Sequence, residues 1–164
     1  MEEAKKLLHD ANKYLDTADH LCHVTYPLVN DTKLLIIIAE NIFNALNKGI
    51  SALLYYERLY KRINLYPEDF SSKFDVFKFN CAQRYNFPRE NIALIQDVKE
   101  LVINRREAPM EFARKDKFII ASENFKLHAI SLDTVKKYIS QAKLFMNRLN
   151  EVFAINDRRF GRER

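Results

Sequence analysis

The sequence predicts an all-α fold, an up-and-down bundle of about five helices. The chain has 164 residues but only 2 glycines and 4 prolines, which favours a few long helices over a turn-rich β-sandwich. Its most apolar long segment, residues 33–63, repeats apolar residues at intervals of three or four, as a helix surrounded by other helices does. We expect a single domain over residues 1–156 and a basic, flexible tail over residues 157–164.

Helical periodicity and end signals place the individual helices. Pro27 and the pair Asn30-Asp31 indicate a connection before the central helix, and Asn86-Phe87-Pro88 stops the third helix. Ser131 is expected to cap the last helix. The expected helices span residues 2–23, 33–63, 68–85, 89–106 and 131–156.

One segment lacks the helical period. Residues 117–121 form a short apolar run, residues 122–124 have turn chemistry, and residues 125–130 alternate apolar and polar side chains. This pattern predicts a small β-hairpin near residues 117–130. Because an isolated two-stranded ribbon is marginally stable, we expect the hairpin to pack on the helices.

Small residues line one stripe of the central helix. Ala45, Gly49 and Ala52 are spaced as neighbours on one face. Glycine costs about 1 kcal/mol relative to alanine inside a helix, so its presence predicts the close approach of another helix. That helix belongs either to this chain or to a second copy, which makes the stripe a candidate packing or dimer seam.

Composition limits the functional classes. The formal charge of +5 permits contact with nucleic acid without requiring it. Cys22 and Cys81 are expected to be reduced, buried thiols of a cytoplasmic protein. The longest apolar run, Leu34 to Ala39, is shorter than the roughly 20 residues that a membrane span needs. No ligand motif predicts a metal, and none predicts a cofactor.

A cluster of basic residues is the candidate phosphate-binding or RNA-binding patch. Arginine forks bind phosphate oxygens, and lysines add positive charge. The alternative is that these charges pair with the interleaved acidic residues and with the last carbonyls of the fourth helix. The basic residues are Arg105, Arg106, Arg114, Lys115 and Lys117.

The helical layout, with the segments Ala39–Ile42 (AENI) and Leu53–Glu57 (LLYYE), resembles the HEPN superfamily (higher eukaryotes and prokaryotes nucleotide-binding). Residues 105–116 followed by a hairpin look like an elaboration found in some small archaeal members. The resemblance implies a helical bundle that is often a homodimer. Many members are ribonucleases or toxin partners of nucleotidyltransferases.

Ribonuclease members carry an arginine, four to six residues, and then a histidine. A cation there stabilises the charged phosphorane-like state, and an imidazole moves the proton. The sequence departs from this pattern. His128 would need an arginine at one of positions 121–123, which are alanine, serine and glutamate. Counted from Arg105, the histidine would fall on one of positions 110–112, which are methionine, glutamate and phenylalanine. No catalytic residue is carried over.

We therefore expect a non-catalytic HEPN-like module that contacts RNA, a nucleotide or a partner protein such as a nucleotidyltransferase, as a homodimer. One alternative is a degenerate toxin or ribonuclease-type enzyme that uses Arg105, Arg106, Glu107 and His128. The other is a purely structural interaction bundle that docks through the small-residue seam or an apolar helix face.

Overall fold

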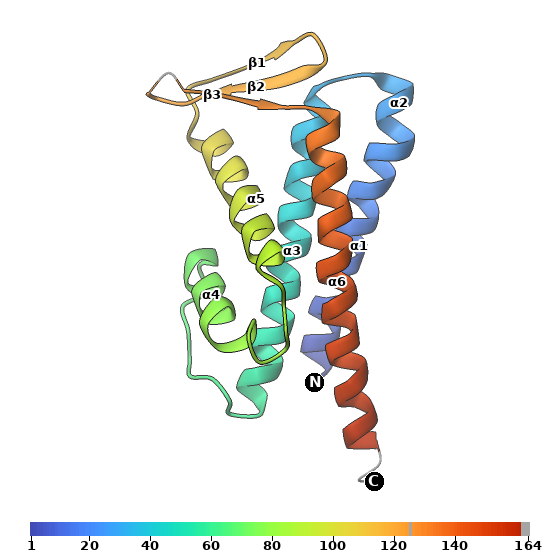
Figure 1. The fold of residues 1–164 in the computed structure, drawn as a ribbon, viewed down its shortest axis with the longest axis vertical. Coiled ribbons are helices and arrows are strands. Elements are labelled where there is room, and N and C mark those ends of the chain that lie inside the picture. The colour runs from blue at the N-terminus through green and yellow to red at the C-terminus, as the bar shows by residue number, and fades with distance from the viewer. Residues whose placement is uncertain (125, 162–164) are drawn as a thin grey trace.

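The computed structural model describes residues 1–124 and 126–161, and it is mainly helical with a small antiparallel sheet at one end (Figure 1). The bounds are α1 Glu2–His20, η1 Leu21–Thr25, α2 Tyr26–Val29, α3 Lys33–Leu59, α4 Phe70–Val76, η2 Phe77–Cys81, α5 Arg89–Glu107, β1 Met110–Arg114, β2 Lys117–Ala121, β3 Leu127–Ile130 and α6 Leu132–Gly161. The elements η1 and η2 are π-helical turns. They join α1 to α2 and extend α4. The expected mainly helical fold is therefore confirmed, with five helical segments among the described residues.

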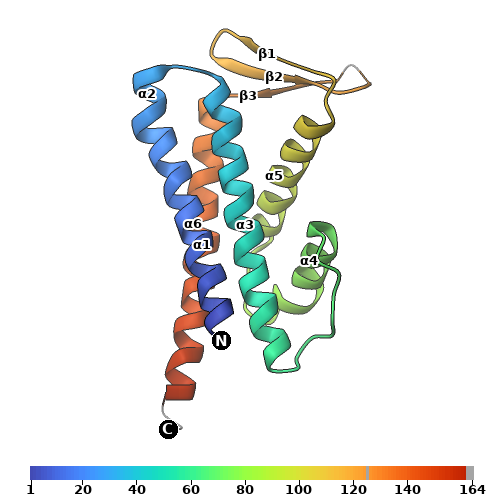
Figure 2. The same cartoon turned by 180° about the vertical axis from the view of Figure 1, so that it is seen from behind.

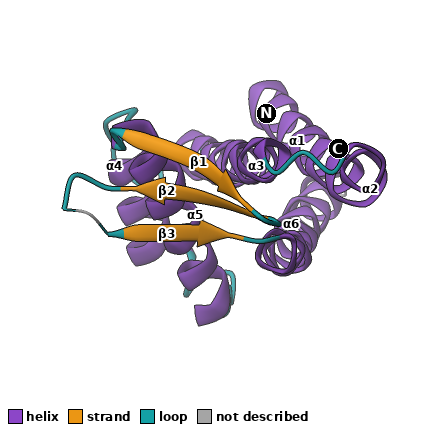
Figure 3. Cartoon of the chain, turned by 90° about the horizontal axis from the view of Figure 1, so that it is seen from above, coloured by secondary structure: helices purple, strands orange, loops and turns teal. Residues whose placement is uncertain are grey.

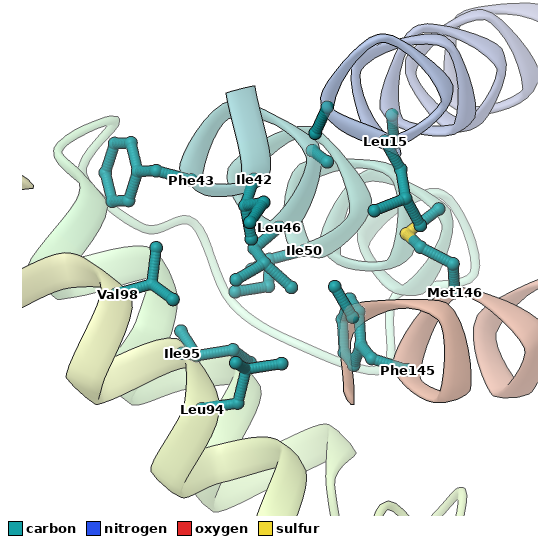
Figure 4. Packing of buried hydrophobic residues seen from close by; sticks show 14 of the residues in the cluster. Leu15, Ile42, Phe43, Leu46, Ile50, Leu94, Ile95, Val98, Phe145 and Met146 are labelled. Atoms are coloured by element: carbon teal, nitrogen blue, oxygen red, sulfur yellow. The ribbon is translucent and has the colours of Figure 1, made fainter. Parts of the chain in front are cut away.

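The helix α3 forms the centre of the core. The helices α1, α5 and α6 lie around it in both views (Figures 1 and 2), and α4 covers its lower half. Its side chains Ile42, Leu46 and Ile50 are fully buried. Figure 4 shows them between the α5 residue Ile95 and the α6 residue Phe145. The predicted central helix is therefore confirmed, although it ends at Leu59 rather than near residue 63.

Gly49 packs directly against α6. A Cβ atom at this position would lie 3.0 Å from Leu149 Cδ2 and 3.3 Å from Phe145 Cε1. Ala45 and Ala52 are also fully buried. The helix that the small residues are predicted to approach closely is therefore α6 of the same chain. Gly49 is covered within one copy of the chain.

The first helical segment is longer than the sequence indicates. Residues 24–29, expected to be a connection, continue the helix through η1 and α2. The Tyr26 N–H donates to the Leu21 carbonyl, five residues back. This wider π-type turn directly precedes Pro27, which lacks an N–H and is poorly accommodated in a regular α-helical ladder. Asn30, at φ 52°, ends the segment.

The sheet has three antiparallel strands in the order β1-β2-β3. The strands β2 and β3 confirm the predicted hairpin, whereas β1 was not predicted. Phe118 and Ile130 pair across β2 and β3, and both are buried. Seen from above, the strands lie over α5 and reach α3 and α6 (Figure 3). The hairpin is thus supported both by a third strand and by the helices beneath it.

The last helix also exceeds its expected length. The Thr134 N–H donates to Ser131 Oγ at 3.3 Å, which confirms the predicted cap. The helix α6 then continues to Gly161, so residues 157–161 of the expected tail are helical, and Asp157 Oδ2 lies 3.1 Å from Lys5 Nζ. Residues 162–164 lie outside the described residues. None of the helices in the described part of the chain combines the length and apolarity needed to cross a bilayer.

Lys73 on α4 supports a first prediction. It is only 8% exposed, its Nζ donates to Ser51 Oγ at 3.0 Å, and burial lowers its pKa below 10.5. Because the unfolded chain then holds the proton more tightly, this group destabilises the fold below its folded pKa. We expect Lys73→Met to raise the free energy of unfolding by about 1 kcal/mol at pH 7.

The gain from Lys73→Met should shrink as the pH rises through the lowered pKa and past 10.5, because above 10.5 the lysine becomes neutral in both states. Urea unfolding of both proteins at pH 7 and at high pH measures the difference. Lys78→Met, on a half-buried lysine nearby, is the control and should show no such gain. Lower stability of Lys73→Met at pH 7 would contradict the prediction.

Candidate phosphate-binding site

A buried carboxylate near the end of α3 organises a group of charged residues. The Glu57 side chain is fully buried. Its Oε1 accepts a hydrogen bond from Arg62 Nη1 at 3.1 Å and another from the Tyr85 hydroxyl, and its Oε2 accepts one from Arg84 Nη1. A carboxylate removed from water is tolerated only with such partners. Glu57 therefore fixes both guanidinium groups at this end of the bundle.

Two turns bring these partners to Glu57. After α3, Lys61 takes a positive φ of 55°, and the Arg62 N–H donates to the Glu57 carbonyl at 3.0 Å. After η2, the Tyr85 N–H donates to the Cys81 carbonyl at 3.1 Å, and Asn86 takes a positive φ of 56°. Each turn reverses the chain at a helix end, so that Arg62 and Arg84, which lie 5 and 27 positions from Glu57, contact the same carboxylate.

The helix α6 supplies the remaining cations. Arg148 Nε donates to the Tyr85 carbonyl at 2.8 Å, and Arg148 Nη1 donates to Glu151 Oε2 at 3.1 Å. Arg159 follows three turns further along the same helix. These side chains surround a cavity of about 380 Å³. We call it the arginine pocket and define it by Arg62, Arg84, Arg148 and Arg159.

The arginine pocket has an excess of positive charge. Its four guanidinium groups are offset by two contacting carboxylates, Glu57 beneath the pocket and Glu151 beside it. Among the described residues, no aspartate or glutamate lines the pocket itself. Each guanidinium has five N–H donors, more than the single bond from Arg84 to Glu57 or the two bonds of Arg148 require. The pocket is suited to an anion with several oxygen acceptors.

Tyr85 remains a hydrogen-bond donor in this site. Burial raises the pKa of its phenol, and the hydrogen bond to Glu57 raises it further. Burial likewise raises the pKa of the nearby Cys81 thiol to about 12. Cys22 and Cys81 are both free and buried. Neither the Tyr85 hydroxyl nor the Cys81 thiol is an activated nucleophile at neutral pH, because both hold their protons there.

The structure separates the basic residues that the sequence groups together. Arg105 lies between two carboxylates, 3.0 Å from Glu40 Oε1 and 3.1 Å from Glu111 Oε2. The Arg106 guanidinium lies 5.8 Å from the centre of the Phe43 ring. Arg105 therefore pairs with acidic residues, as the alternative to a phosphate-binding patch predicts.

The other three residues of the predicted patch lie elsewhere. Arg114 and Lys117 are paired at the β1–β2 turn, and Lys115 forms the turn with a φ of 56°. This turn is at the opposite end of β1 from the end of α5 (Figure 1). All three are exposed, and none of them lines the arginine pocket.

The arginine pocket was missed in the sequence because its residues are far apart along the chain. One signal was available. Glu57 follows Ile50 and Leu53 at helical spacing, so it lies on the most apolar face of α3. A carboxylate in that position requires cationic partners, although the sequence does not identify which arginines supply them.

Comparison with known proteins finds no matching family model, no matching curated protein and no matching solved structure.

Proposed function

We propose that this chain is a HEPN-like, non-catalytic module that binds the phosphate groups of RNA or of a nucleotide in the arginine pocket. The observation that carries the proposal is the concave cluster of four guanidinium groups with no carboxylate in its described lining. Arginine matches phosphate geometry because its planar fork donates two parallel hydrogen bonds. The helical layout and the resemblance of residues 39–57 support the HEPN-like part of the proposal.

The lining of the pocket favours binding over catalysis. Within the described residues, no histidine lines it, and the ribonuclease chemistry implied by the resemblance uses an imidazole. Arg62 and Arg84 are held by Glu57, and Arg148 is held by Tyr85. Three of the four cations are thus held in place, so an anion binds with less further ordering of side chains.

The test is a fluorescence anisotropy titration of single-stranded RNA over a salt series. Affinity should fall as salt rises, with a logarithmic slope of about −0.7 for each phosphate contact. Arg159→Gln should weaken binding about tenfold and reduce that slope by about 0.7. In the described part of the chain no hydrogen bond, ion pair or ring contact holds Arg159, so its replacement should leave stability unchanged.

Arg158→Gln is the matched control, because Arg158 has the same charge and helix but does not line the pocket. It should bind RNA nearly as the parent does. Absence of RNA binding at low salt, or equal losses in the two variants, would overturn the proposal. An intact RNA band after prolonged incubation is expected for a non-catalytic module, and cleavage that tracks the purified protein would contradict it.

The expected homodimer stays a prediction of the proposed family. Sedimentation at micromolar concentration tests it, and a strict monomer would contradict it.

A further inference from the structure

A second cavity adjoins the arginine pocket. It has a volume of about 560 Å³ and lies between the start of α5 and the middle of α6. Arg148 lines both cavities, so they share a wall. Three carboxamides line the second cavity. We call it the amide pocket and define it by Asn91, Gln141 and Asn147.

The amide pocket contains polar groups without protein partners. Asn91 is only 4% exposed, yet no group in the described ranges 1–124 and 126–161 hydrogen-bonds its side-chain amide. Asn91 is not among the residues with a fully buried, unpaired side-chain atom, so its amide reaches the cavity, where water or a ligand can satisfy it. Gln141 and Asn147 likewise have no side-chain partner among the described residues. The donors and acceptors of all three amides are therefore available to a bound molecule.

The two pockets lie along one face of α6. Gln141, Leu144 and Arg148 are spaced by three and four residues in the amide pocket. The same helix continues through Arg148, Val152 and Arg159 in the arginine pocket. At 1.5 Å per residue, the strip from Gln141 to Arg159 is about 27 Å long. One extended ligand can therefore occupy both pockets.

The two pockets carry different charges and therefore suit different chemical groups. Glu90 and Glu151 line the amide pocket, so it disfavours phosphate. At base edges, carboxylates accept hydrogen bonds and carboxamides both accept and donate them. Leu144 adds an apolar surface that is 66% exposed. Unpaired bases are recognised in this way, through their hydrogen-bonding edges and by contact with their faces. In a duplex, these edges are already paired.

We infer that the strip along α6 binds a single-stranded RNA segment, with a backbone phosphate in the arginine pocket and an unpaired base in the amide pocket. The inference rests on the proposed function, because the phosphate must bind in the arginine pocket for the base to reach the amide pocket.

The experiment compares three probes by anisotropy and competition: a short labelled single-stranded RNA, the same sequence as a duplex, and ribose 5-phosphate. The variant Gln141→Ala, Asn147→Ala removes two carboxamides without altering charge. It should weaken single-stranded RNA binding about tenfold and leave the salt slope and the binding of ribose 5-phosphate unchanged. Arg159→Gln should weaken the binding of both ligands. The duplex should bind more weakly than the single strand.

The outcomes separate the two proposals. If neither RNA nor ribose 5-phosphate binds at low salt, the proposed function fails. If both bind and depend on Arg159, but the carboxamide variant binds the single strand as the parent does or the duplex binds equally well, only this inference fails. If the double variant has a lower melting temperature than the parent, Asn147→Ala alone replaces it in the binding comparison, because Asn147 is exposed.

Discussion

The double variant Arg62→Ala, Arg84→Ala is expected to lose about 3 to 5 kcal/mol of unfolding free energy. It leaves the carboxylate of Glu57 fully buried without a cation, with only the Tyr85 hydroxyl still donating to it. The converse variant, Glu57→Gln, should cost less, about 1 to 3 kcal/mol. The two arginine side chains that remain are 37% and 43% exposed, so water can solvate them.

Urea unfolding at pH 7, monitored by circular dichroism, measures the difference in stability loss between the double arginine variant and Glu57→Gln. Adding Glu57→Gln to the double arginine variant should restore part of the lost stability, because it removes the unpaired buried charge. A triple variant less stable than the double variant, or a double variant within about 1 kcal/mol of the parent, would contradict the role assigned to Glu57.

Gly49→Leu is expected to lower the free energy of unfolding by about 3 kcal/mol. The first added carbon would already lie 3.0 Å from Leu149 Cδ2, so three further carbons require α3 and α6 to separate. Gly49→Ala is the matched control. Its gain in helix propensity of about 1 kcal/mol should offset the contact with the end of the Leu149 side chain, leaving stability nearly unchanged.

Thermal and urea unfolding of the Gly49 variants at several protein concentrations provides the measurement. The contact is between two helices of one chain, so the loss in Gly49→Leu should not depend on concentration. Stability of Gly49→Leu equal to that of Gly49→Ala would show that this helix contact is not tightly packed.

Local sequence patterns were sufficient for most of the fold. The buried face of α3 follows from apolar residues at helical spacing, and the cap of α6 follows from Ser131. The strand β1 was missed because all five of its residues are exposed. It has no apolar face to create a pattern, and it is a strand only through its pairing with β2. The helical residues 24–29 were missed because Pro27 is usually a helix breaker.

The candidate site, unlike most of the fold, could not be predicted from local sequence patterns. Arg105 and Arg106 look like a phosphate-binding patch because they are adjacent in sequence, but Arg105 pairs with Glu40, 65 positions away. Arg84 and Arg148 lie 27 positions from Glu57 and 63 from Tyr85, respectively. Charge pairing depends on distance in space, and no periodicity along the chain encodes it.

The sequence by itself determined where most of the helices lie and that α3 is buried. Helix formation and burial depend on residues three or four positions apart, and these are visible in one dimension. Only the tertiary structure decided which arginines remain available to a ligand. The packing of the turns after α3 and η2 against α6 brings Arg62, Arg84 and Arg148 together, while the sheet directs Glu111 to Arg105.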